Sequence, residues 1–109
     1  MKRGSLVTVA AKGHYSGKPR PALVLQSDLF AAMDSVTLCL ISSEIIAAPL
    51  LRLTVTPTAE NGLKTTCQIM VDKLVTVPRD SIGHVRGVLD EATMLQVSRS
   101  LTLFLGIAS

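Results

Sequence analysis

Aromatic residues are nearly absent from this sequence: its 109 residues include no Trp, one Tyr and two Phe. A core must therefore be built from Val, Leu, Ile and Met, and the aromatic-lined groove with which SH3-like modules bind proline-rich peptides is missing. Cysteine is scarce too, since Cys39 and Cys67 form no CxxC pair and have no neighbouring histidine. Without metal-ligand spacing, we expect two reduced thiols that serve packing.

Long apolar runs are missing as well. The longest, residues 45–51 and 101–107, fall far short of the roughly 20 residues of a membrane-spanning helix, and no signal-peptide pattern follows the basic tip 1–6. We therefore expect a cytoplasmic protein without a membrane segment. The formal net charge of +3 is compatible with a polyanionic partner without requiring one. With 48% hydrophobic and 17% charged residues, the chain is predicted to fold as one domain over 1–109.

The first three quarters of the chain show the pattern of a small antiparallel β protein, with short apolar or alternating segments between turn signals. The predicted strands are Leu6–Ala10, Ala22–Leu25, Val36–Ile41, Leu51–Val55, Thr65–Val71 and Leu74–Val77. Because Asn61-Gly62 readily adopts positive φ, a long hairpin is expected to join the fourth of these strands to the fifth. His84 is placed in a separate turn.

The last quarter changes to a helical period. Asp90 is well placed as an N-cap, and Gly106 can end the helix. One face of this predicted helix carries Met94, Val97, Leu101, Phe104 and Leu105, whereas Leu103 falls on the opposite face, exposed or buried against another chain. The sequence thus predicts a mainly β fold, a small, mostly antiparallel barrel with an amphipathic C-terminal α-helix lying on it.

Several short strings follow one another along the chain. They are Arg3–Val7, Gly17–Leu25 with its Arg20-Pro21 pair, Val36–Ser43, Met70–Leu74 and Phe104–Gly106. In this order they resemble the MazF/PemK/Kid family of toxins, whose most recognisable stretch is a loop ending in Arg-Pro before an apolar strand. The resemblance covers nearly the whole chain and implies the CcdB/PemK-like fold, a small SH3-like antiparallel barrel with a C-terminal α-helix.

The resemblance also implies an activity and partners. Such toxins belong to type II toxin–antitoxin systems and are metal-independent, sequence-specific endoribonucleases that cleave single-stranded mRNA by attack of a 2′-hydroxyl, which inhibits growth. We accordingly expect no cofactor and a homodimer with its RNA groove across the interface. A cognate antitoxin with a disordered acidic tail would cover that groove.

Cleavage without a metal needs a base for the 2′-hydroxyl, an acid for the leaving 5′-oxygen and cationic donors for the phosphorane. The resemblance assigns the catalytic arginine to Arg20, whose guanidinium stays protonated and suits two phosphate oxygens. It places the active-site hydroxyl at Ser42, although a slip of one residue would select Ser43. His14 matches a histidine in some relatives and is the third catalytic candidate, with simple exposure as the alternative.

Further candidates concern RNA binding. Tyr15 could stack on an unpaired base or pack against the barrel, and Lys18 and Ser43 flank the catalytic candidates. Asp72 matches an RNA-contacting residue in one branch of the family, and Lys73 follows it. That branch has a catalytic Arg where this chain has Met70, so Lys73 or Arg20 would supply the cation. The plainer interpretation of Asp72 is a turn residue that caps the strand after it.

The main alternative is a gyrase poison of the CcdB type, which shares the fold and is not an enzyme. Its action depends on a C-terminal Trp-Gly-Ile, whereas this chain ends in Phe104-Leu105-Gly106-Ile107 and has no Trp. A metal site is not predicted, because the two histidines lie far apart in the sequence and no cluster has ligand spacing. The sequence therefore favours the ribonuclease.

Overall fold

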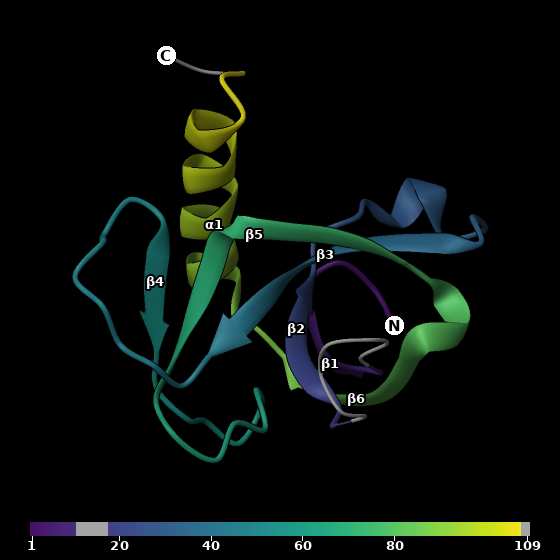
Figure 1. Ribbon diagram of the computed structural model, residues 1–109, viewed down its shortest axis with the longest axis horizontal. Helices are drawn as coiled ribbons and strands as arrows, with labels where there is room; N and C mark the ends of the chain where they lie inside the picture. Colours follow the sequence, from purple (N-terminus) through teal and green to yellow (C-terminus); the bar gives the residue numbers. More distant parts are fainter. Residues whose placement is uncertain (11–17, 108–109) are drawn as a thin grey trace.

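A single curved antiparallel sheet forms most of the molecule. The computed structural model describes residues 1–10 and 18–107. The elements are β1 (Ser5–Val9), β2 (Arg20–Val24), β3 (Ser35–Ser42), β4 (Arg52–Val55), β5 (Cys67–Pro78), β6 (Ile82–Val88) and α1 (Glu91–Phe104), with short 3-10 turns at Asp28–Phe30 and Arg79–Ser81. The strands follow the order β4-β5-β3-β2-β1-β6, and β5 and β6 sweep around the inner strands (Figure 1). The predicted mainly β fold with a C-terminal helix is confirmed.

Strand β5 is continuous where the sequence predicted two strands. It pairs with β4 from Arg52↔Met70 to Val55↔Cys67, which confirms the expected hairpin, and it pairs with β3 on both sides of residues 70–73. The register shifts there, because only Leu40 of β3 lies opposite these four residues of β5. The predicted break at residues 72–73 was wrong because the polar side chains there occupy strand positions, where they interact with a neighbouring strand.

Strand β6 was missed, and the turn predicted for His84 was wrong. The sequence of β6, IGHVRGV, contains two glycines, and its side chains are at most half-buried. It therefore lacks the apolar alternation that identifies a strand. Pairing with β1, which includes two register shifts, holds it in the sheet. The backbone N–H of His84 also donates a hydrogen bond to Thr8 Oγ1 at 2.9 Å.

The core consists of two apolar clusters, one on each face of the curved sheet, because their members alternate along the strands. Leu23, Ile69 and Val71 belong to the cluster that α1 covers, while Val7 and Leu38 belong to the other. The expected packing of thiols is confirmed, since both cysteines are buried and free of disulfides. Burial raises the pKa of Cys39 to about 12, which keeps that thiol protonated and unreactive.

Helix α1 has the predicted ends. The Asp90 carboxylate accepts a hydrogen bond from Thr93 N at 3.0 Å, and this bond, with that from the Thr93 hydroxyl, lowers the pKa of the Asp90 carboxyl. At the other end Gly106 adopts a φ of 75°, which terminates the helix. With 14 residues α1 is short, and within residues 1–10 and 18–107 no helix is long and apolar enough to cross a membrane.

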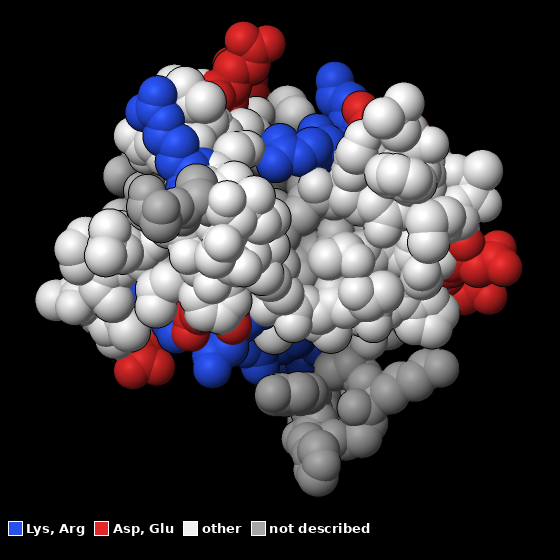
Figure 2. Space-filling view, turned by 90° about the horizontal axis from the view of Figure 1, so that it is seen from above, with Lys and Arg blue, Asp and Glu red and all other residues white. Residues whose placement is uncertain are grey.

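The packed face of α1 is shorter than predicted. Val97 is fully buried, and Met94 and Leu101 pack against the same cluster. Phe104 and Leu105, however, are 44% and 50% exposed, because the last turns of the helix rise beyond β5 (Figure 1). Exposed Leu95, Leu103 and Ile107 join them, and seen from above the middle of this end is uncharged, with charged residues towards its edges (Figure 2).

An ion pair links β4 to β5. The Arg52 guanidinium donates from Nε to Asp72 Oδ1 at 3.0 Å and from Nη2 to Oδ2 at 3.2 Å, while Lys73 Nζ lies 3.9 Å from Oδ2. Burial raises the pKa of the Asp72 carboxyl, but the hydrogen bond and charge of Arg52, with the charge of Lys73, outweigh burial and hold that pKa below its ordinary 3.8. Asp72 is therefore a strand residue that stabilises the sheet, and the turn-capping interpretation was wrong.

Replacement of this carboxylate should destabilise the protein in a pH-dependent way. Asp72→Asn is expected to lower the free energy of unfolding by about 1–2 kcal/mol at neutral pH. Because the folded-state pKa is depressed, this contribution is present above the ordinary pKa and is lost as the pH falls through the folded-state value. Urea unfolding of both proteins from neutral to acid pH should show the difference shrinking; a difference independent of pH would contradict this role.

The buried face of α1 should tolerate no charge. Val97→Asp places an unpaired carboxylate in the core and is expected to cost about 3 kcal/mol or more, which unfolds or aggregates the protein. Gln96→Asp, on the adjacent exposed position, is the control and should leave the thermal midpoint within a few degrees. Circular dichroism melts measure both, and a Val97→Asp melt like that of wild type would contradict the packing of α1.

Candidate active site

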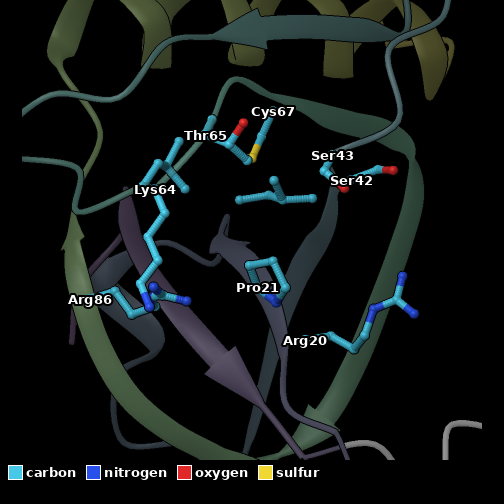
Figure 3. A pocket seen from close by; sticks show the side chains of 10 residues that line it. Arg20, Pro21, Ser42, Ser43, Lys64, Thr65, Cys67 and Arg86 are labelled. Carbon is cyan, nitrogen blue, oxygen red and sulfur yellow. Dashed lines mark hydrogen bonds between the residues drawn. The ribbon is translucent and has the colours of Figure 1, made fainter.

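A pocket of about 430 Å³ opens where β2 begins and β3 ends. Its other side is formed by the loop that precedes β5 and by one residue of β6 (Figure 3). The residues that line it are Arg20, Pro21, Ile41, Ser42, Ser43, Leu63, Lys64, Thr65, Cys67 and Arg86. Its volume suits a nucleotide-sized ligand. Four segments distant in the sequence thus meet at one open cavity.

The first wall of the pocket carries Arg20 and the two serines. Ala22 pairs with Leu40, so the antiparallel register brings Arg20, two residues earlier, to the end of β3 that carries Ser42. Figure 3 shows the Arg20 side chain rising on the same side as Ser42 and Ser43. Sequence reasoning placed these three residues in the site, and the pocket brings them together.

The two serines differ in their surroundings. Ser42 is half-buried, and its Oγ accepts a hydrogen bond from Glu44 N at 3.0 Å, which orients the hydroxyl. The hydroxyl proton can still be donated to an anion in the pocket. Ser43 is exposed at the rim. The geometry therefore favours Ser42 as the hydroxyl that faces a reacting phosphate, with Ser43 as a flanking contact.

The second wall depends on the turn at Asn61-Gly62. Asn61 is buried, and its Oδ1 accepts hydrogen bonds from Thr58 N and Leu63 N, both at 3.0 Å. Gly62 has a φ of 66°, and a Cβ there would collide with the carbonyl oxygen of Arg86. Across the same contact, Val88 N donates to Glu60 O at 2.9 Å. The loop thus lies directly on β6.

This contact places Lys64 and Arg86 on one wall, opposite Arg20. Figure 3 shows their side chains running towards one another, and both are exposed. Sequence reasoning missed both residues. Lys64 belongs to a loop without a motif, and Arg86 belongs to the strand that the apolar pattern does not identify. Only the turn signal at Asn61-Gly62 pointed to this region.

Cys67, the first residue of β5, lines the pocket next to the second wall. Its side chain is 7% exposed, and Sγ donates a hydrogen bond to Thr65 O at 3.2 Å. Burial raises the pKa of the Cys67 thiol, and the charge of Arg86 acts in the opposite direction without cancelling this rise. The thiol therefore stays protonated and is a packing group, as predicted.

The remaining candidates do not line the pocket. Lys18 is exposed just before β2, and Asp72 and Lys73 belong to the ion-paired group on β5. His14 and Tyr15 lie outside the described residues, so their predicted roles stay predictions. His84 is exposed on β6.

The electrostatic character of the pocket points to an anionic ligand. Arg20, Lys64 and Arg86 surround it, and no carboxylate is among its lining residues in the part of the chain that the structure describes. Hydroxyl donors from the serines and Thr65 lie between the cations. Within that same part, no three His, Cys, Asp or Glu side chains gather as metal ligands would. A phosphodiester fits this combination of cations and hydroxyls.

Solved structures that share the fold include an endoribonuclease and a toxin. The chain matches an endoribonuclease in complex with its cognate antitoxin from mycobacterial species with a TM-score of 0.81 and 17% identity, over 100% of this chain and 98% of that one. It matches the Mycobacterium tuberculosis toxin MazF-mt6 with a TM-score of 0.79 and 18% identity, over 94% and 96%. At these identities the likeness shows a shared fold.

Sequence similarity is more specific. The chain is 47% identical over 108 residues to a Mycolicibacterium smegmatis protein named "Probable endoribonuclease MazF", a match that covers 99% of both chains. Residues 2–105 match the family described as PemK-like, MazF-like toxin of type II toxin-antitoxin system. On these two matches, the chain belongs to the PemK-like, MazF-like family of type II toxin–antitoxin toxins.

Proposed function

We propose that this protein is the toxin of a type II toxin–antitoxin system and acts as a metal-independent, sequence-specific endoribonuclease on single-stranded mRNA in the cytoplasm. The observation that carries the proposal is the meeting of Arg20 and Ser42 at a cationic pocket of nucleotide size, in a chain 47% identical to a named endoribonuclease. The same similarity favours this activity over gyrase poisoning, since the family match is to PemK-like and MazF-like toxins.

The reaction follows from what the pocket can hold. The 2′-oxygen bonds to phosphorus, the bond to the 5′-oxygen breaks, and the products are a 2′,3′-cyclic phosphate and a 5′-hydroxyl. Charge on the non-bridging oxygens grows in the transition state, where the Arg20 fork and the Ser42 hydroxyl can donate hydrogen bonds. Arg20 stays protonated, so it stabilises charge and does not act as the base. His14 remains the candidate for proton transfer.

The protein partners are proposed from surface character. A related mycobacterial endoribonuclease is known in complex with its cognate antitoxin, and a cationic pocket would accept the acidic, disordered tail expected of such a partner. The uncharged end of the molecule around Phe104 and Leu105 exposes several large apolar side chains, which suits burial against a second protein chain. A homodimer and an antitoxin complex are therefore both proposed.

Loss of Arg20 should abolish cleavage and preserve the fold. Arg20→Ala is expected to slow cleavage of a defined single-stranded RNA by two orders of magnitude or more, since removal of one donor to a developing oxyanion costs about 10²–10³ in kcat. Arg20→Lys keeps the charge but lacks the planar fork, so its rate should be intermediate.

Arg99→Ala removes an exposed cation of α1 and serves as the control for Arg20→Ala. Single-turnover rates and circular dichroism on all three variants check this. A well-folded Arg20→Ala protein with a near-wild-type rate would refute the assignment.

Chelation should not affect the reaction, because the proposed donors are protein side chains. Cleavage in excess EDTA is expected to proceed at the untreated rate and to leave 2′,3′-cyclic phosphate ends or their hydrolysis products. End-group analysis by mass spectrometry on the cleaved RNA measures this. Loss of activity on chelation, with recovery on adding magnesium or zinc, would show instead that a metal takes part.

A further inference from the structure

We propose that Lys64 and Arg86 form a second phosphate subsite, which binds a phosphate next to the scissile one in the same RNA strand. The inference rests on the proposed ribonuclease function, and it assigns a binding role to two residues that the reaction itself does not require. In this arrangement Arg20 and Ser42 hold the reacting phosphate on the first wall. The second wall holds the adjacent phosphate, whose charge does not change during the reaction.

The first argument is the unbalanced charge of the second wall. Lys64 and Arg86 point towards one another, yet neither has a carboxylate partner among residues 1–10 and 18–107 (Figure 3). Arg52, by contrast, is neutralised by Asp72. At these exposed positions water weakens the repulsion between the two cations, and an anion bound between them would turn it into attraction. A phosphate, with several acceptor oxygens, can accept from an ammonium and a guanidinium together.

The second argument is that the backbone holds these residues in place. Gly62 packs on the Arg86 carbonyl, and Gly87 packs as closely on Glu60 and Asn61, where a Cβ on either glycine would collide with the opposite backbone. Asn61 further ties the loop together by donating from Nδ2 to Thr56 O at 2.9 Å. Lys64 therefore lies in a loop held in place by these contacts, only two residues after Gly62. Its position near Arg86 follows from the contact of Gly62 with the Arg86 carbonyl.

The third argument is the position of the subsite relative to Arg20. Both walls belong to one continuous pocket of about 430 Å³, which Thr65, Ser42 and Ser43 also line. One phosphate group is much smaller than this cavity, so a phosphate held at Arg20 leaves room for another part of the same ligand at the second wall. A single RNA strand supplies phosphates in series, separated by a ribose that the pocket hydroxyls can contact.

The role predicts a distinct kinetic signature. The second phosphate carries the same charge before and during the reaction, so its contacts contribute equally to substrate and transition-state binding. Lys64→Gln with Arg86→Gln should therefore raise KM by about ten- to a hundredfold and leave kcat within a few-fold of wild type. Arg20 should behave differently, since its loss lowers kcat.

Methylphosphonate substitution identifies the phosphate directly. The probe is a short RNA whose cut position has been mapped and whose attacking 2′-hydroxyl is methylated, so that it binds without being cleaved. Each phosphate of this RNA is replaced in turn by a neutral methylphosphonate, and the Kd of each substituted RNA is measured. For the wild type, substitution at one phosphate beside the scissile one should weaken binding about tenfold or more. For the double variant, the same substitution should have no further effect on the Kd, because the two cations that contact this phosphate have already been removed.

Salt dependence gives an independent measurement on the same complexes. The slope of log Kd against log salt should fall by about 0.7 in the double variant, which corresponds to one phosphate contact of a single strand. Arg99→Gln removes one charge from the exposed face of α1 and should leave the slope and the methylphosphonate profile unchanged. Lys64→Arg, with Arg86 intact, keeps both cations of the second wall, so its affinity for RNA should stay close to that of the wild type.

The outcomes separate this inference from the function on which it rests. If the wild-type protein cleaves no RNA, the proposed function fails. If the wild type cleaves and the double variant has an unchanged KM, or remains sensitive at every methylphosphonate position, the second subsite is refuted. A fall in kcat equal to the fall in kcat/KM would likewise refute it, since that result would place these cations on the reacting phosphate.

Discussion

Direct backbone contact between the loop 56–66 and β6 is the constraint on which the pocket depends. The contact exists because Gly62 and Gly87 have no side chains where the two segments cross. It is reinforced by the bond from Val88 N to Glu60 O and by the buried amide of Asn61. Without it, the loop would have no fixed position relative to β2 and β3, and the pocket would have only one wall.

The length of β5 provides the second constraint. Its twelve residues pair with β3 between Gln68 and Pro78 and with β4 at the start, so β5 connects both clusters of the core and carries the loop to the pocket's edge. The Arg52–Asp72 pair secures the outer strand to it. Charge is thus neutralised where it supports the sheet, whereas the cations of the pocket have no carboxylate among its described lining residues. This division fits a rigid scaffold with an anion-binding site at its edge.

In the proposed reaction, the two walls divide the work that RNA cleavage requires. A stabilising donor must meet charge that grows during the reaction, and we propose that Arg20 does so from a stiff position beside Pro21. A binding contact must only hold the strand in place, and exposed cations on a braced loop are sufficient for that. Under this proposal, the separation of these tasks between two walls would let a small domain with few aromatic side chains hold a flexible strand.

Much was determined by the sequence alone. Apolar alternation located five of the six strands, and capping chemistry at Asp90 and Gly106 located the helix, because these signals are local. The ordered strings identified the family, and they pointed to Arg20 and Ser42, which the fold brings to one pocket. These predictions needed no knowledge of how distant segments meet.

The tertiary structure decided the rest. Strand β6 has no apolar pattern, and pairing with β1 alone makes it a strand. Asp72 is an ion-paired strand residue because Arg52 lies across from it, which no spacing in the sequence reveals. Lys64 and Arg86 are 22 positions apart and become neighbours only through the glycine crossing. Each of these properties depends on a contact between distant segments, which local sequence does not encode.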